Sequence, residues 1–357
     1  GRPRRTIVSD LVLSTFNLRN MQLAGLNRFP GAVPYDQTFY RRKVRWTGDL
    51  IRLVGPDVMG FEELWASNAL LEALDHVNLD DDYRIVARPP DETGRQQNAL
   101  IVHERHDVVS EEWITDLPDD LVLKKGDDDE TSISVDTERF SRPVLKVVVD
   151  LEVGRTEKVG VTFLVAHLKS KRPMNLDRDT LDRPTFRSPD RTALGSALST
   201  IKRTAEAAAL RVLISRIQYP DPDNDDEGMP VVVMGDLNTS SNSTELDIIT
   251  TQPQYRLEHG SGVGRSSKWG LYSVATLQHL RSLNDVYLTY LHRGFHDSLD
   301  HILGSQHFYD HSAARLWSFR EASVFNDHLP FAHLGSDHEQ HVADHGIVRA
   351  VFEHDPA

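Results

Sequence analysis

A carboxylate and an amide follow a short apolar run in the middle of the chain. Val231 to Met234 are all apolar, and Asp236 and Asn238 come soon after them with one residue between the two. On an extended backbone, alternate residues face the same side, so both side chains point in one direction. An Asp can hold a metal ion or orient a water molecule, and an Asn can hydrogen-bond a phosphate. The pattern is also typical of a plain turn after a strand, because Asp and Asn are common in turns.

Two adjacent glutamates end another apolar run. The segment DVMGFEEL extends from Asp57 to Leu64 and contains Glu62 and Glu63. If the segment is a strand, one of the two carboxylates faces a cleft, where a hard cation such as Mg²⁺ takes one or two carboxylates together with phosphate oxygens and water. By itself the motif favours a simpler alternative, in which both glutamates lie in the acidic first turn of the following helix.

Three further polar residues lie beside apolar runs. His167 ends such a run, where an imidazole could stabilise or protonate a departing oxygen at neutral pH. Asn17 follows the run from Ile7 to Phe16, and Arg142 comes just before another run. A single histidine of this kind is more often structural, so these positions gain meaning only together.

An aspartate and two Asp-His pairs lie in the carboxyl-terminal part of the chain. Asp300 is inside the stretch LDHILGS, and the pairs are Asp337 with His338 and Asp344 with His345. A carboxylate from one strand that bonds the imidazole from another fixes its tautomer and strengthens it as an acid or base, as in a catalytic triad. Since the chain has 17 histidines, chance pairs are common. We therefore expect one of the two pairs to have no catalytic role.

The composition limits what such residues can do. The chain has 357 residues, 39% of them apolar, and no cysteine, so any metal must be held by oxygen or imidazole ligands. The net charge of −14 has the wrong sign for a protein that coats nucleic acid with Lys and Arg. An acidic enzyme can still act on a polyanion when a metal ion neutralises the phosphate. A basic strip from Lys169 to Arg191 is either a contact for substrate phosphate or a plain charged loop.

The chain shows no internal repeat and no convincing linker, so we expect a single domain over residues 1–357. Loop insertions are expected near residues 116–138, 171–193 and 219–229, where charged and turn-forming residues gather. No apolar run approaches the roughly 20 residues of a membrane span, which predicts a soluble chain without stable membrane insertion, cytoplasmic or secreted after removal of a leader. We expect a monomer, although no feature of the sequence reports the oligomeric state.

The polar residues must be positioned by buried strands and by helices between them. Apolar runs that predict strands extend over Ile7 to Phe16, Asp57 to Phe61, Ala99 to Val102, Val144 to Leu151, Val161 to Ala166, Val231 to Met234 and Ile347 to Phe352. A helix is predicted from about Leu194 to Arg216, with a buried face formed by Leu198, Ile201, Ala205, Ala208 and Val212. Strands and helices mixed in this way suggest sheets covered by helices.

Taken together, the motifs resemble a known superfamily. The series FNLRN, GFEEL, FSRP, AHLKS, GDLN, LDHILGS and DHGIV is similar to that of the endonuclease/exonuclease/phosphatase superfamily, which contains deoxyribonuclease I, abasic-site endonucleases, sphingomyelinases and inositol polyphosphate phosphatases. The resemblance covers residues 10 to 353. It implies an α/β fold of four layers, in which two mixed β-sheets pack face to face with helices on the outside.

The resemblance also implies a role for each site residue. The implied catalytic residues are His345, Asp300, His167, Asp236, Asn238 and Arg142, and the implied metal ligands are Glu63, Asn17, Asp344 and Asp236. By this likeness Asp236 positions or deprotonates the attacking water, Asp300 orients the catalytic His, and Asn238 and Arg142 contact phosphate. The family usually has Gln where this chain has Glu62, which adds either a ligand or only a charge.

The choice between the two Asp-His pairs depends on the strand that follows. Asp344 and His345 are followed at once by the apolar run GIVRAVFE, whereas Asp337 and His338 have the preceding serine that the family usually shows. We prefer the first pair because strand phase fixes geometry. His338 and Asp337 are the alternatives.

The resemblance implies a metal-dependent phosphodiesterase. The leading hypothesis is a nuclease that hydrolyses DNA or RNA by in-line attack of water, with Mg²⁺ or Mn²⁺, or else Ca²⁺, as the cofactor. The alternative is a phosphomonoesterase or lipid phosphodiesterase of the same fold, acting on a small phosphodiester or a lipid.

Overall fold

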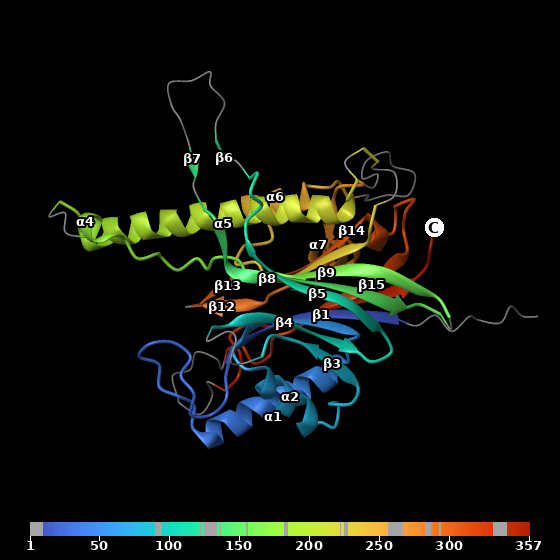
Figure 1. Ribbon diagram of the computed structural model, residues 1–357, viewed down its shortest axis with the longest axis horizontal. Coiled ribbons are helices and arrows are strands. Elements are labelled where there is room, and N and C mark those ends of the chain that lie inside the picture. Colours follow the sequence, from blue (N-terminus) through green and yellow to red (C-terminus); the bar gives the residue numbers. More distant parts are fainter. Residues whose placement is uncertain are drawn as a thin grey trace, which may run out of the picture.

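Two six-stranded sheets form the centre of the protein, as the computed structural model in Figure 1 shows. The structure describes residues 10–89, 95–121, 123–124, 134–135, 137–154, 156–181, 185–221, 223–224, 228–255, 267–282, 287–292, 294–330 and 341–357. Within these residues, no helix is long and apolar enough to cross a membrane.

The first sheet combines strands from both ends of the described chain. Its order is β15 (Trp317–Phe325), β16 (Ile347–His354), β1 (Asp10–Met21), β2 (Val58–Leu64), β4 (Gln97–His103) and β3 (Tyr83–Val86). Only β1 and β2 pair in parallel, so the sheet is mixed. Both strands of that pair consequently deliver the residues at their carboxyl ends to the same edge.

The second sheet has the same pattern of pairing. Its order is β11 (Leu271–Ser273), β14 (Asp300–Ser305), β10 (Val231–Asp236), β9 (Lys158–Val165), β8 (Arg139–Glu152) and β5 (Asp107–Asp116). Here β9 and β10 form the parallel pair, and the remaining neighbours are antiparallel. The residues that follow β9 and β10 therefore also lie at one edge.

The two sheets pack face to face through their apolar side chains. Buried residues of both, among them Leu13, Val58, Val165 and Met234, form one core cluster. The sheets approach closely at Gly60 of β2, where an added Cβ would lie 2.9 Å from the Met234 sulfur. A larger residue at Gly60 would push the sheets apart and displace whatever their edges position.

Helices cover the outer faces of both sheets (Figure 1). Helices α1 (Gln37–Val54) and α2 (Ser67–His76) pack on the first sheet, and α5 (Ser188–Gln218) and α6 (Thr244–Thr250) pack on the second. The Asp36 side chain caps α1 by accepting from the Phe39 amide, and Gly55 ends it with φ of 56°. The predicted four-layer fold is thus confirmed.

The remaining elements are short. They are α4 (Arg178–Leu181), α7 (Val274–Arg281), the 3₁₀ turn η1 (Gln306–Phe308), the hairpin of β12 (Tyr290–His292) and β13 (Phe295–Asp297), and the ribbon of β6 (Leu123–Lys124) and β7 (Ser134–Val135). Figure 1 shows the β6–β7 ribbon extending away from the body of the two sheets.

Helix α5 occurs where the sequence predicts it, but its buried face is different. Leu198 and Ile201, predicted to be buried, are 42% and 45% exposed. The buried face contains Arg203 and Glu206 instead, and both have partners. Arg203 Nε donates to Glu245 at 3.0 Å, and Glu206 accepts from the amides of Ser141 and Lys169. The apolar periodicity predicted the wrong buried face of α5, because charged side chains can be buried when hydrogen bonds satisfy them.

The two adjacent glutamates belong to a strand. Glu62 and Glu63 are part of β2, and α2 begins only at Ser67 with no acidic residue in its first turn. The helix-start alternative for this motif is therefore wrong.

Candidate active site

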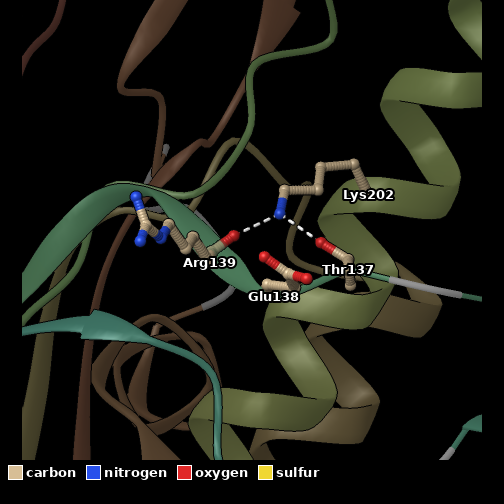
Figure 2. A pocket seen from close by; sticks show the side chains of 4 residues that line it. All are labelled: Thr137, Glu138, Arg139 and Lys202. Atoms are coloured by element: carbon tan, nitrogen blue, oxygen red, sulfur yellow. Dashed lines mark hydrogen bonds between the residues drawn. The ribbon is translucent and has the colours of Figure 1, made fainter.

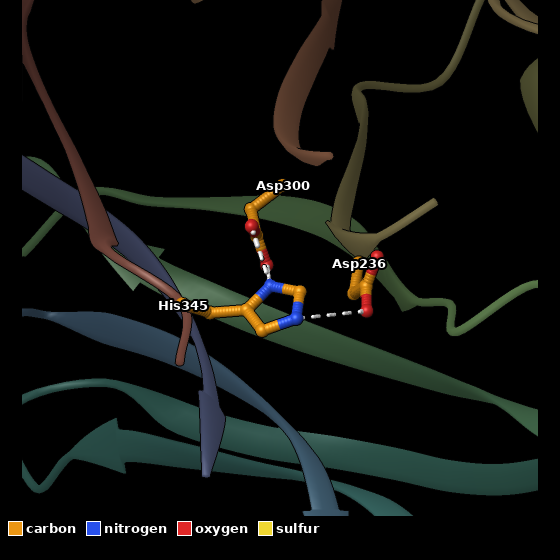
Figure 3. Close-up of side chains that lie close together, drawn as sticks. All are labelled: Asp236, Asp300 and His345. Carbon is orange, nitrogen blue, oxygen red and sulfur yellow. Dashed lines mark hydrogen bonds and ion pairs between the residues drawn. The ribbon is translucent and has the colours of Figure 1, made fainter. Parts of the chain in front are cut away.

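Three buried side chains from three segments meet at the edge shared by the sheets (Figure 3). Asp236 ends β10 and pairs across the sheet with Asp300, the first residue of β14. His345 lies two residues before β16 and forms an isolated bridge with Tyr290. One ligand atom from each of the three side chains lies within 4.8 Å of the others.

His345 is held by Asp300. Its Nδ1 donates to the Asp300 carboxylate, at 2.9 Å from one oxygen and 3.1 Å from the other. Burial acts to lower the pKa of His345, but the charges of Asp300 and Asp236 and the hydrogen bond to Asp300 raise it well above its usual value. His345 is therefore an imidazolium, and its Nε2 lies 3.7 Å from Asp236 Oδ2.

Asp236 is the centre of a polar network. Its Oδ2 accepts from Asn17 Nδ2 at 3.1 Å and lies 3.4 Å from His167 Nε2. Its Oδ1 accepts from the backbone amide of Asn238 at 2.9 Å. Burial raises the pKa of Asp236 to about 7, with the His345 charge opposing this and the Asp300 charge adding to it. A carboxylate with this pKa can take a proton from water near neutral pH.

Residues at the carboxyl end of β9 support this network. Burial, together with the charges of Arg142 and His345, lowers the pKa of His167 well below its usual value, so its ring is neutral. Asn238 Nδ2 and an Arg142 guanidinium nitrogen both donate to the backbone oxygen of Leu168, each at 3.0 Å. The Leu168 carbonyl therefore holds both Asn238 and Arg142, the two residues predicted to contact phosphate.

The adjacent glutamates have different partners. Glu63 has φ of 59°, and its carboxylate accepts from the Asn20 amide at 3.0 Å. Glu62 lies against the second sheet, because a Cβ on Gly235 would be 2.9 Å from its Oε1. Burial raises the pKa of Glu62 well above its usual value, and the charges of Asp300 and Asp236 raise it further. Glu62 thus lies against the residue that precedes Asp236, whereas Glu63 is bonded to an amide of the first sheet.

The predicted ligand Asp344 directly precedes His345 in the chain and lies near Arg19. Its Oδ2 is 3.9 Å from Arg19 Nε, and its charge contributes to the raised pKa of His345. Asp337 and His338 lie outside the described residues, so the choice between the two pairs stays a prediction.

A buried lysine near the predicted ligands was missed in the sequence. Lys43 of α1 is fully buried, and its Nζ has no hydrogen-bond partner among the described residues. Burial lowers its pKa to about 7, as does the charge of Arg19, whereas Asp344 and Glu63 raise it. A lysine on a mostly polar helix gives no sequence signal of burial.

The β12–β13 hairpin adjoins His345. The Tyr290 ring centroid lies 4.9 Å from that of His345. Lys171 Nζ holds the hairpin through Asp297 at 2.6 Å, which uses one charge of the basic strip internally. Phe295 is 78% exposed. The hairpin therefore contacts His345 through Tyr290 and exposes the ring of Phe295 to solvent.

The donor set fits a divalent cation. Hard cations take carboxylate oxygens, and buried imidazoles and amides complete or orient such a site. Asp236 and Asp300 provide two buried carboxylates and Asn17 is bonded to Asp236, whereas the protonated His345 offers no lone pair to a cation. An ion would also offset the negative charge that raises the pKa of Glu62 and Asp236.

A separate hollow lies beside α5 (Figure 2). It has a volume of about 400 Å³ and is lined by Thr137, Glu138, Arg139 and Lys202. The Lys202 ammonium donates to the Thr137 hydroxyl and to the Arg139 carbonyl, so it is already bonded. The hollow shares no residue with the cluster of Figure 3 and is not our candidate site.

Comparison with known proteins gives one family. The family described as Endonuclease/Exonuclease/phosphatase family matches residues 15–338. No curated protein matches the chain. The family match supports a metal-dependent phosphoesterase in general.

Solved structures with the same fold are distant in sequence. An endonuclease/exonuclease/phosphatase from Bacteroides vulgatus is 12% identical with a TM-score of 0.53, covering 97% of this chain and 100% of its own. Truncated Caenorhabditis elegans TDP2 is 13% identical with a TM-score of 0.51, over 96% and 97% of the two chains. A humanized D. rerio TDP2 is 14% identical with a TM-score of 0.54, over 96% and 98%. These likenesses show the shared fold.

Proposed function

Because the chain belongs to the endonuclease/exonuclease/phosphatase family, we propose that it is a divalent-metal-dependent phosphodiesterase of the nuclease type, acting on DNA or RNA. One observation carries the proposal: two buried side chains at the sheet edge, Asp236 and His345, face each other at 3.7 Å, and Asp300 holds the His345 ring. Such a pair supplies a base for water and a positive charge for a phosphate oxygen in one place.

In this proposal each residue has a defined task. Asp236 accepts a proton from the attacking water, and Asn17, bonded to Asp236, orients that water. His345, held by Asp300, neutralises charge on a phosphate oxygen as it develops. Asn238 and Arg142, both held by the Leu168 carbonyl, contact the phosphate.

The metal has its own proposed ligands. Glu63, Asn17, Asp344 and Asp236 would hold Mg²⁺ or Mn²⁺. The bound ion would supply positive charge that polarises the phosphate and compensates the acidic residues. The chain thereby acts on a polyanion despite its net charge of −14.

A lipid phosphodiesterase is the second candidate. The observation that favours it is Phe295, an exposed aromatic ring on the hairpin that contacts His345 through Tyr290. A single phenylalanine gives little apolar area for a membrane surface. Nucleic acid is therefore the first choice.

The test is a substrate panel with metal-stripped protein. Plasmid DNA, single-stranded DNA, RNA and bis-p-nitrophenyl phosphate are incubated with and without Mg²⁺ or Mn²⁺, together with sphingomyelin vesicles and a phosphomonoester. The variants are His345→Ala and His338→Ala. Metal-dependent cleavage of nucleic acid that is lost only in His345→Ala supports the proposal. Intact nucleic acid with turnover of lipid or monoester would refute it.

A further inference from the structure

The β12–β13 hairpin has ring side chains along one of its two faces. Tyr290 and His292 are two residues apart on β12, and side chains with this spacing on a strand point to the same side. Phe295 is paired with His292 across the hairpin, and directly opposed residues of an antiparallel pair also share a face. Asp297 is paired with Tyr290 in the same way. We call the side of the hairpin that bears these four residues its ring face.

The ring face begins at the candidate active site and becomes more exposed with distance from it. The Tyr290 ring centroid lies 4.9 Å from that of His345. The His292 ring is stacked with the Tyr290 ring, with 6.0 Å between the centroids and 13° between the planes. Tyr290 is half-buried, His292 is exposed, and Phe295 is 78% exposed. Ring side chains thus continue outward from His345 to the end of the hairpin.

The base of the hairpin is fixed to the segments that position His345 and Asp300. The Gly346 amide donates to the Thr289 carbonyl at 2.7 Å, and Tyr290 forms a bridge with His345. The Thr289 hydroxyl accepts from the amide of Asp300 at 3.2 Å. A group bound on the ring face is therefore held at a defined place relative to His345.

The charge of the ring face suits a polyanion that is bound without a basic coat. Asp297 is the one acid on this face, and Lys171 Nζ donates to it at 2.6 Å. Since the whole chain has a net charge of −14, attraction between basic residues and phosphates can supply little of its affinity for a nucleic acid. Aromatic side chains bind a strand in another way, because every base can stack its flat face on a ring.

We propose that the ring face binds the bases of an unpaired nucleic-acid strand whose phosphate lies at His345, so that the substrate is single-stranded DNA or RNA. This inference rests on the proposed function and narrows its substrate class. Bases in a duplex cover one another's faces, whereas those of an unpaired strand are free to stack on protein rings. A lipid surface fits less well, because the ring face has a single phenylalanine and no aliphatic side chain.

Binding of an unpaired strand by Phe295 variants tests the proposal. Fluorescence anisotropy is measured in Mg²⁺ with a single strand, the same strand without its bases, and the duplex, all with phosphorothioate linkages that resist hydrolysis. Phe295→Leu keeps an apolar side chain without a ring, Phe295→Ala removes both, and Phe295→Trp keeps a ring. Leu53→Ala, at a 64% exposed position on the outer helix α1, is the control. A 2-aminopurine base in the single strand reports stacking through the quenching of its fluorescence.

The expected result is that the wild type binds the single strand more tightly than the strand without bases or the duplex. Phe295→Ala and Phe295→Leu lower the affinity for the single strand by about fivefold or more, which corresponds to the loss of stacking on one ring, and they reduce the quenching. Phe295→Trp and Leu53→Ala keep the wild-type affinity and quenching. Affinity for the strand without bases is the same in all the proteins.

Failure of this inference can be separated from failure of the proposed function. Equal wild-type affinity for strands with and without bases overturns the inference, as does wild-type affinity in Phe295→Ala, even if the metal-loaded protein cuts duplex DNA. Absence of single-strand binding by the wild type also overturns it, and so does a Phe295→Ala variant that loses binding to sphingomyelin vesicles but not to the strand. Base-dependent binding that is lost in Phe295→Ala, in a protein that cuts none of the phosphodiesters tested, supports the inference and refutes the proposed function.

Discussion

Replacing Lys43 by methionine is expected to stabilise the metal-free protein against unfolding. Lys43 is fully buried, its Nζ has no partner among the described residues, and its pKa falls from 10.5 to about 7. Each pKa unit corresponds to about 1.36 kcal/mol, so holding the ammonium in the fold costs about 5 kcal/mol below pH 7. Methionine fills a similar space without a charge.

The stability advantage of Lys43→Met is expected to fall as the pH rises. Between pH 7 and 10.5 the unfolded chain holds the Lys43 proton more tightly than the folded chain does, so wild-type stability rises with pH in this window. The advantage of Lys43→Met is therefore about 5 kcal/mol at pH 6.5 and about 1.5 kcal/mol at pH 9.5.

Urea unfolding of the metal-free proteins at pH 6.5 and 9.5 measures both values. The control is Lys202→Met, which removes a lysine from a partly exposed position on α5. A Lys43→Met protein that is less stable than the wild type at pH 6.5, or whose advantage does not change with pH, would refute the view that Lys43 is buried without a partner.

Three further predictions concern the site and its supports. Asp236→Asn is expected to lower kcat by about 10³-fold, because the variant lacks the carboxylate that takes a proton from water; cleavage at the wild-type rate by this variant would contradict the prediction. Glu206→Ala is expected to destabilise the fold by about 2–4 kcal/mol, because it leaves two buried amides unpaired. Ile201→Gln, at an exposed position, is expected to change the free energy of unfolding by about 0.5 kcal/mol or less. Equal urea unfolding midpoints for the two variants would be inconsistent with the observed buried face of α5. Phe295 exposes an aromatic ring on which a base can stack, so Phe295→Ala is expected to raise KM for single-stranded DNA severalfold. Hydrolysis of bis-p-nitrophenyl phosphate, which has no base, is expected to stay unchanged. Equal effects on the two substrates would exclude base stacking on this ring.

The fold was predictable because its strands carry a strong local signal. Fully buried strands such as Val231–Asp236 read as continuous apolar runs, and the polar residue that ends each run marks the edge of the sheet. The order of these motifs along the chain then indicated the fold through its resemblance to a known superfamily. In the structure, the register of β10 with β14 places Asp236 beside Asp300. Local pattern and global arrangement agree at these positions.

What the sequence did not reveal depends on contacts between distant segments. Whether Glu62 or Glu63 faces the second sheet depends on the left-handed backbone at Glu63, which periodicity does not show. The buried face of α5 is set by Glu245, Ser141 and Lys169, which come from other elements. Hydrogen bonds of this kind make charged residues behave as core residues, and no apolar pattern marks them.

The most direct test of the proposed chemistry is the rate of metal-dependent cleavage of single-stranded DNA by the wild type and by Asp300→Asn. The Asp300 carboxylate accepts from His345 Nδ1 and helps to keep the imidazole charged. Asparagine preserves the shape and removes that charge, so we predict a loss in kcat of about 10³- to 10⁴-fold, with unchanged folding. Cleavage by Asp300→Asn at the wild-type rate, or a wild type that leaves the DNA intact with every divalent ion tested, would contradict the account.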